Sequence, residues 1–119
     1  MHELSIALSL VELASEEAQK AGASKVEKLY IRVGTLSGVV PDALRFAFDI
    51  ATQHTPLENA ELVIEEVPVR IFCATCNAEQ ELPPSLVLKC PVCQTLSGDI
   101  RQGKELELVT LTLLTEQPS

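Results

Sequence analysis

The sequence predicts an α+β protein in which two helices pack on a small three-stranded sheet, with a four-cysteine lobe inserted into the chain. Two segments repeat apolar residues at helical spacing, others alternate like strands, and four cysteines come in two close pairs. The length of 119 residues suits one domain with a smaller appendage. We expect residues 1–69 together with 105–119 to form one lobe and residues 70–104 to form the other.

The first helix is predicted from Glu3 onward, because apolar residues recur there every three or four positions. Gly22 is the natural end of this helix, since glycine readily adopts the left-handed conformation that closes helices. The apolar face that we expect to be buried consists of Leu4, Ala7, Leu8, Val11, Ala14 and Ala18.

A strand and a second helix follow. Residues 25–33 alternate, with Leu29, Ile31 and Val33 on the face that we expect to be buried. Pro41 suits the first position of a helix, and the helical spacing then continues until Pro56 forbids it. The apolar residues that repeat at this spacing are Leu44, Ala47, Phe48 and Ala51.

The remaining strands lie on either side of the cysteines. Residues 62–67 and 69–72 are rich in β-branched residues and are separated by Pro68, so the strand continues into the cysteine segment. Residues 105–114 alternate again, but the apolar positions change phase near Leu108 and Val109. One extra residue in a strand moves all later side chains to the opposite face, so we predict a β-bulge at this point.

Composition and charge exclude several classes of function. Seventeen acidic against nine basic residues give a net charge of −8, which disfavours nucleic acids and anionic membranes as partners. Aromatic residues are only 3% of the chain, too few for a base-stacking surface. The sequence shows no secretory signal with a basic start and an apolar stretch, and no segment that could span a membrane, so we expect a cytoplasmic protein. The reducing cytoplasm keeps cysteines as free thiols, which favours metal binding.

The cysteines form a C-x2-C-x13-C-x2-C array made of Cys73, Cys76, Cys90 and Cys93. Two such pairs supply four thiolates in a tetrahedron, the geometry that Zn²⁺ prefers. Because cysteines occupy all four coordination positions, the predicted zinc is structural. We interpret the inserted lobe as a zinc ribbon. A disulfide or redox role and an iron site are the less favoured alternatives.

The amino terminus is a second candidate metal site. The free amine of Met1, the backbone nitrogen of His2 and the imidazole of His2 can close two adjacent chelate rings, with three nitrogen donors in one plane. Such a site favours Ni²⁺ or Cu²⁺ over Zn²⁺, and Glu3 can add a carboxylate. The plainer alternative is that His2 is a solvated terminal residue. We expect the other histidine, His54, to interact with the dipole at the end of the second helix or to face solvent.

Four features together resemble the hydrogenase nickel-incorporation family HypA/HybF. They are M-H-E at 1–3, the alanine- and leucine-rich first helix, V-G-x-L-S-G-V at 33–39, and the paired C-x-x-C knuckles that end in C-P-V-C. The resemblance implies that the first lobe binds nickel and that the four cysteines bind zinc. It further implies delivery of nickel to the hydrogenase large subunit precursor together with a partner GTPase.

Carried to this sequence, the resemblance makes His2 the principal nickel ligand, with Glu3 and the Met1 amine beside it. It also implies an acidic residue near the start of the second helix, for which Asp42 is the nearest candidate. No nucleophile–base pair, phosphate loop or H-E-x-x-H motif indicates an enzyme. The main alternative is a zinc-ribbon protein-docking module, and an enzyme with Lewis-acid zinc comes third. Homodimer formation is left open.

Overall fold

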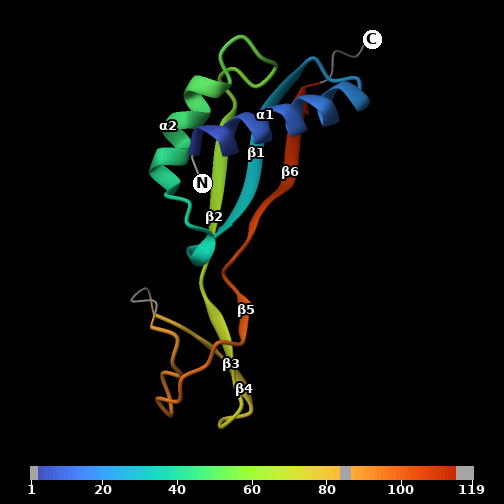
Figure 1. Cartoon of the computed structure of the whole chain (residues 1–119). Helices are drawn as coiled ribbons and strands as arrows, with labels where there is room; N and C mark the ends of the chain where they lie inside the picture. The colour runs from blue at the N-terminus through green and yellow to red at the C-terminus, as the bar shows by residue number, and fades with distance from the viewer. Residues whose placement is uncertain (1–2, 84–86, 115–119) are drawn as a thin grey trace.

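The computed structural model describes residues 3–83 and 87–114 of the chain and contains two small three-stranded sheets joined end to end (Figure 1). The first sheet carries the helices α1 (Glu3–Lys20) and α2 (Pro41–Ala51). The molecule is elongated, with principal extents of 61 × 29 × 16 Å and a radius of gyration of 18.0 Å. A compact domain of this length would have a radius of gyration of about 13.5 Å. No helix in the described ranges is long and apolar enough to cross a membrane.

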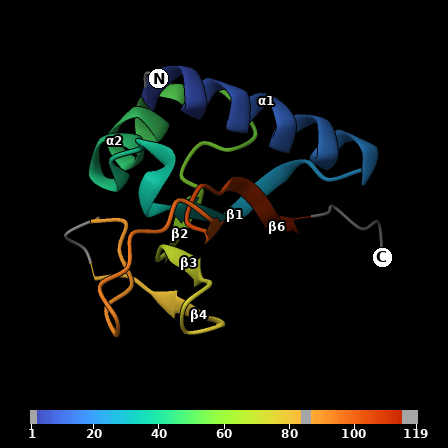
Figure 2. The same ribbon diagram turned by 60° about the horizontal axis from the view of Figure 1, so that its bottom comes forward.

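The first sheet is mixed and has β1 (Lys25–Gly34) at its centre. Strand β2 (Glu61–Val67) runs parallel to β1, and β6 (Leu106–Leu114) runs antiparallel to it. Both helices cover the same face of this sheet (Figure 2). The predicted α+β arrangement of two helices on a three-stranded sheet is therefore confirmed.

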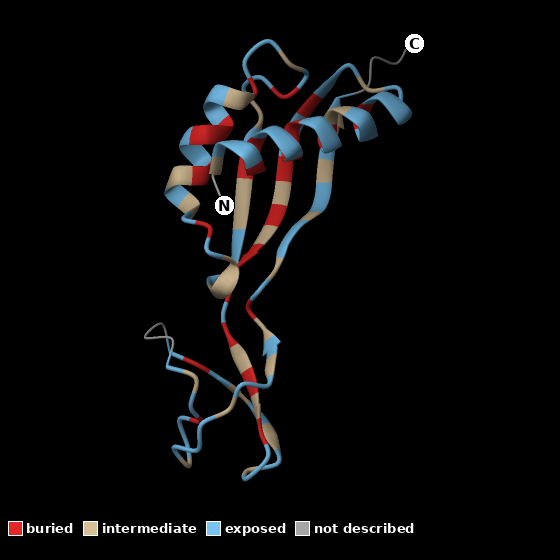
Figure 3. Cartoon of the chain, in the orientation of Figure 1, coloured by how far each residue is buried: buried red, intermediate tan, exposed pale blue. Residues whose placement is uncertain are grey.

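The core of this half is aliphatic except for Phe48 and lies between the sheet and the helices (Figure 3). Along β1, Leu29 and Ile31 are fully buried and Val33 nearly so, as the alternation predicted. The second helix buries Leu44, Ala47 and Phe48 against the same cluster.

The predicted buried face of α1 was wrong at two positions. Leu4 and Leu8 are 46% and 52% exposed, whereas Ile6 and Leu10 are buried. Both pairs flank the small residues that form the middle of the face, so helical spacing alone allows either pair to be inside. The helix turns the Ile6 and Leu10 side toward the sheet, and this choice depends on how α1 crosses the strands.

The predicted β-bulge in the last strand is confirmed. Tyr30 of β1 faces Thr110 of β6, but the next residue, Ile31, faces Leu108, so Val109 is the extra residue. The bulge allows Leu108 and Leu111 to pack on the same core although they are three residues apart. A second irregularity, between Val26 and Lys28 of β1, was not predicted.

The second sheet contains β3 (Arg70–Cys73) between β4 (Ala78–Glu81) and β5 (Ile100–Gln102), with both pairs antiparallel. Three buried residues, Val69, Ile71 and Leu82, form its small cluster. Leu36 of the 3-10 turn η1 (Thr35–Ser37) packs against this cluster from the other half of the molecule. So few buried side chains cannot stabilise residues 70–104 by the hydrophobic effect alone.

The two sheets meet where the chain leaves β2 and returns to β6. Gly34 donates its backbone N–H to the Glu105 carbonyl at 2.7 Å, and Leu36 donates to the Gly103 carbonyl at 2.7 Å. The Thr35 hydroxyl donates to the Val67 carbonyl at 3.1 Å. A Cβ atom on Gly34 would overlap the Gly103 carbonyl and would lie 2.7 Å from the Glu105 nitrogen. The joint therefore requires glycine at position 34.

This contact predicts that Gly34→Ala destabilises the protein by about 3 kcal/mol, because backbone on the other strand must move to admit the methyl group. Gly98→Ala is the matched control, since nothing lies within 4 Å of a Cβ there. We expect the control to change the free energy of unfolding by no more than about 0.5 kcal/mol. Chemical denaturation of both zinc-loaded variants measures the difference, and equal midpoints would refute the tight joint.

Candidate metal centre

The four cysteines converge at the end of the second sheet. Their Sγ atoms all lie within 4.8 Å of one another. Between the two pairs, 3.5 Å separates the Sγ atoms of Cys73 and Cys93, and 3.8 Å separates those of Cys76 and Cys90. A tetrahedral Zn²⁺ with Zn–S bonds of about 2.3 Å has sulfur atoms about 3.8 Å apart, so the cluster fits structural zinc. A disulfide needs about 2.05 Å between sulfur atoms, and all four cysteines are free thiols.

Each cysteine pair is shaped by a residue in the left-handed conformation directly after it. Asn77 has φ = 54° and Gln94 has φ = 66°. These corners turn the chain so that both sulfur atoms of a pair point to the same centre, and the N–H of Cys76 donates to Cys73 Sγ at 3.4 Å. Neither corner was predicted from the sequence. Asparagine at position 77 could have indicated a left-handed corner, because asparagine tolerates this conformation, whereas glutamine at position 94 does not indicate one.

The four thiols have different environments. Cys73 and Cys90 are buried, whereas Cys76 and Cys93 are partly exposed. Hydrogen bonds with Thr95 lower the pKa of the Cys93 thiol to about 6; the one with the Thr95 side chain has the larger effect and the one with its backbone the smaller. The pKa of the Cys76 thiol is raised to about 12, mainly by its hydrogen bond with Cys93 and next by burial. Without metal the cluster therefore keeps protons that zinc must displace, and acid weakens zinc binding.

Polar contacts around the thiols connect the two cysteine pairs. Thr95 Oγ1 lies 3.2 Å from Cys93 Sγ and 3.4 Å from the hydroxyl of Thr75, which belongs to the other pair. The backbone N–H of Cys90 donates to the Thr95 carbonyl at 2.8 Å, and the Ser97 hydroxyl donates to the Phe72 carbonyl at 2.6 Å. Such contacts orient ligands before the metal binds.

The predicted nickel ligands are only partly within the described residues. Met1 and His2 lie outside them. Glu3 is the first residue of α1 and is partly buried, and Asp42 lies exposed in the first turn of α2. His54 lies exposed beyond the end of α2, where its backbone N–H donates to the Glu58 carboxylate at 2.6 Å. His54 thus forms part of a turn.

A mixed sheet under two helices, joined to a closed cluster of four thiols, defines a small metal-binding protein with two sheets. The family model described as hydrogenase/urease nickel incorporation, metallochaperone, hypA, matches residues 1–113. The chain belongs to this family.

Curated relatives extend the match over almost the whole chain. The hydrogenase maturation factor HypA of Chloroflexus aggregans is 55% identical over 111 residues, which are 93% of this chain and 97% of that protein. HypA of Roseiflexus sp. is 49% identical over 118 residues, which are 99% and 96% of the two chains. The solution structure of the Ni metallochaperone HypA from Helicobacter pylori superposes with a TM-score of 0.67 at 27% identity and covers 98% of this chain and all of that one.

The cluster predicts that zinc, rather than hydrophobic burial, stabilises residues 70–104. Cys90→Ala should expose the backbone amides of this segment to exchange, while α1 and α2 keep their protection. Val92→Ala is the control, because it changes the same cysteine pair at a side chain that is 68% exposed. Amide hydrogen exchange of both variants provides the measurement. Full protection of residues 70–104 in Cys90→Ala would show that zinc does not hold them.

Proposed function

We propose that this chain is a nickel metallochaperone, which binds Ni²⁺ at its amino terminus and helps to insert it into the [NiFe]-hydrogenase large subunit precursor. The observation that carries the proposal is the family match, which runs from residue 1 to residue 113 and so includes both M-H-E and the cysteine pairs. In this proposal residues 1–69 with 105–119 form the nickel-binding lobe, and residues 70–104 form the zinc-binding lobe.

The proposed nickel ligands are His2, the Met1 amine and Glu3. The amine, the backbone nitrogen of His2 and its imidazole can form two adjacent chelate rings, and such planar nitrogen sets suit Ni²⁺. Helix α1 begins at Glu3. Because the first N–H groups of a helix have no carbonyl partner within it, an amide at this end can bind a metal without loss of a helical hydrogen bond.

The zinc has a structural role in this proposal. Cysteine sulfur can fill all four tetrahedral positions, which leaves no open position for water or a substrate. Lewis-acid catalysis requires such a position, and this favours a maturation factor over an enzyme. The protein-docking alternative explains the cysteines equally well but gives no reason for the M-H-E terminus.

The partners and location follow from the same family assignment. We propose that the chain acts with a hydrogenase-maturation GTPase and with the large subunit precursor. A site made of four free thiols suits a reducing compartment, so the cytoplasm is the location that we propose.

The amino-terminal site predicts that small changes at the terminus weaken nickel binding without unfolding the protein. Adding Gly-Ser before Met1 removes the free amine as a donor, and His2→Ala removes the imidazole. Acid should also release nickel, because protons compete for both nitrogens. Calorimetric titration of tag-free protein measures the affinities, with His54→Ala as the control that removes the other histidine.

The outcomes separate the possible ligands. Equal nickel affinity in the native, extended and His2→Ala proteins would refute the terminal site and support the docking module. Loss of affinity in His2→Ala alone would keep His2 as a ligand and exclude the amine. Loss in His54→Ala would move the site to the end of α2.

The two metal sites should also be independent. Four soft thiolates favour tetrahedral Zn²⁺, whereas a planar nitrogen site favours Ni²⁺, so zinc-loaded protein should accept nickel and retain its zinc. Elemental analysis after addition of one equivalent of nickel and removal of free metal tests this. Stoichiometric loss of zinc would show that nickel enters the thiolate cluster.

A further inference from the structure

The unprotected edge of the first sheet points to a docking site. Strand β6 lies at one edge and β2 at the other. Natural proteins protect edge strands from further pairing with charged residues, lysine or proline. Strand β2 follows this rule, with Glu61, Glu65 and Glu66 among its seven residues. Strand β6 has nine residues, L-E-L-V-T-L-T-L-L, and its single charge, Glu107, is paired with Arg32 at 3.2 Å.

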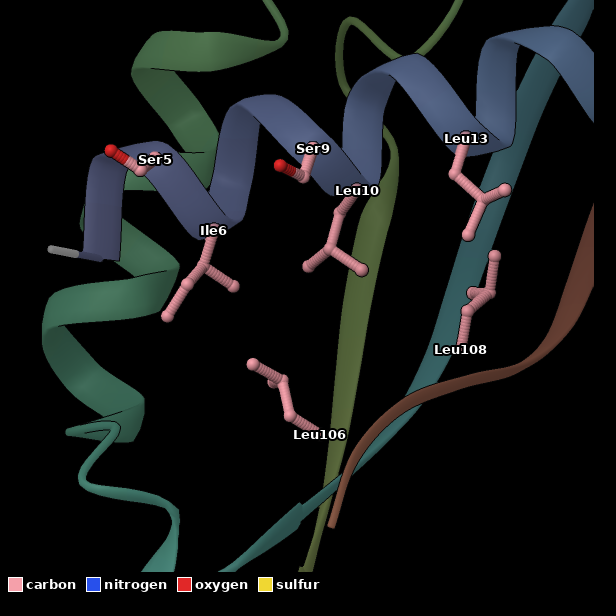
Figure 4. A pocket seen from close by; sticks show the side chains of 7 residues that line it. All are labelled: Ser5, Ile6, Ser9, Leu10, Leu13, Leu106 and Leu108. Carbon is pink, nitrogen blue, oxygen red and sulfur yellow. The ribbon is translucent and has the colours of Figure 1, made fainter. Parts of the chain in front are cut away.

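An apolar groove lies directly above this edge, between α1 and β6 (Figure 4). It begins as a hollow of about 390 Å³ and continues into a second hollow of about 440 Å³ that shares Leu13 and Leu108 with the first. Leu13 is 44% exposed and Val109 is 47% exposed. The first hollow is lined by Ser5, Ile6, Ser9, Leu10, Leu13, Leu106 and Leu108.

The backbone of β6 is available on the same side. The carbonyl of Leu114 accepts a hydrogen bond from the backbone N–H of Ser24 at 3.2 Å, on the side of β1. Because successive residues of a strand point their amides to opposite sides, Leu111 and Leu113 present theirs to the free edge. A fourth strand that pairs there would place every second side chain in the groove, beneath Leu13.

Charge distinguishes the possible occupants. Among the residues that line the two hollows, Glu17 carries the only charge, and none is basic. A second copy of the chain would bring a net charge of −8 against another −8. An occupant with basic residues is attracted by the same field.

We propose that the β6 edge binds an extended segment of a partner protein, with aliphatic residues at every second position and basic residues between them. The segment adds a fourth strand to the sheet, its aliphatic side chains fill the groove under α1, and its basic side chains face solvent. This docking site is independent of nickel binding and goes beyond the function proposed above.

A fluorescein-labelled, end-capped heptapeptide of alternating lysine and valine is the probe, titrated into full-length, zinc-loaded protein and followed by fluorescence anisotropy. We expect saturable binding that Leu13→Glu weakens about tenfold or more, because the carboxylate stands where the valines must be buried. Leu8→Glu is the matched control, an identical change at a 52% exposed residue of the same helix. It should bind the peptide like the unmodified protein. Unchanged unfolding midpoints verify that both variants fold.

Backbone methylation tests whether the peptide binds as a strand. A strand that pairs at one edge uses the backbone amides of alternate residues only. We therefore compare one peptide methylated at the valine backbone nitrogens with another methylated at the lysine backbone nitrogens, and only one of the two should lose binding. The proposal would be overturned if Leu13→Glu bound the probe as tightly as the unmodified protein, or if both methylated peptides still bound. A dimer in sedimentation that Leu13→Glu dissociates and Leu8→Glu does not would also overturn it, by assigning the groove to a second copy.

Discussion

The close crossing of Gly34 and Gly103 determines how the rest of the molecule is arranged. Strand β1 ends at Gly34, between the end of β2 and the start of β6. The chain passes from the end of β2 into the second sheet and comes back from it at the start of β6. Without a Cβ on Gly34, the backbones approach closely enough for the hydrogen bonds from Gly34 and Leu36. The second sheet therefore continues from the first on a short, hydrogen-bonded joint, and the molecule is long and narrow.

The two halves of the molecule are stabilised by different physical means. The half with the helices buries a continuous aliphatic cluster that extends from α1 and α2 to all three strands. Besides two of its cysteines, the other half buries a cluster of three side chains, against which Leu36 from the joint packs. For so small a unit, four zinc–thiolate bonds replace the missing core, and metal binding is equivalent to folding. Leu36 then connects the metal-stabilised half to the end of β1, because it belongs to the turn that follows Gly34.

Much of this arrangement was predictable from local pattern. The strand β1, the helix α2, the bulge at Val109 and the cysteine cluster all follow from periodicity or spacing, which act over a few residues. The side of α1 that is buried was not predictable, because Leu4 and Leu8 offer the helix as much apolar surface as Ile6 and Leu10. The left-handed corner at Gln94 and the packing of Leu36 against the second sheet were not predicted for the same reason: tertiary contacts, not local preference, decide them.

Transport of a metal ion places opposite demands on two sites in one chain. A structural site must hold its ion while the protein works, and closed coordination by four thiolates, two of them buried, satisfies this demand. A transport site must release its ion, which requires exposed ligands and moderate affinity. The proposed nickel ligands belong to the chain end from which α1 starts, and α1 packs on the core, so on this proposal loss of nickel removes nothing on which folding depends. With the nickel site proposed above, the two metals bind in different halves of the molecule, so one metal can be exchanged while the other maintains the fold.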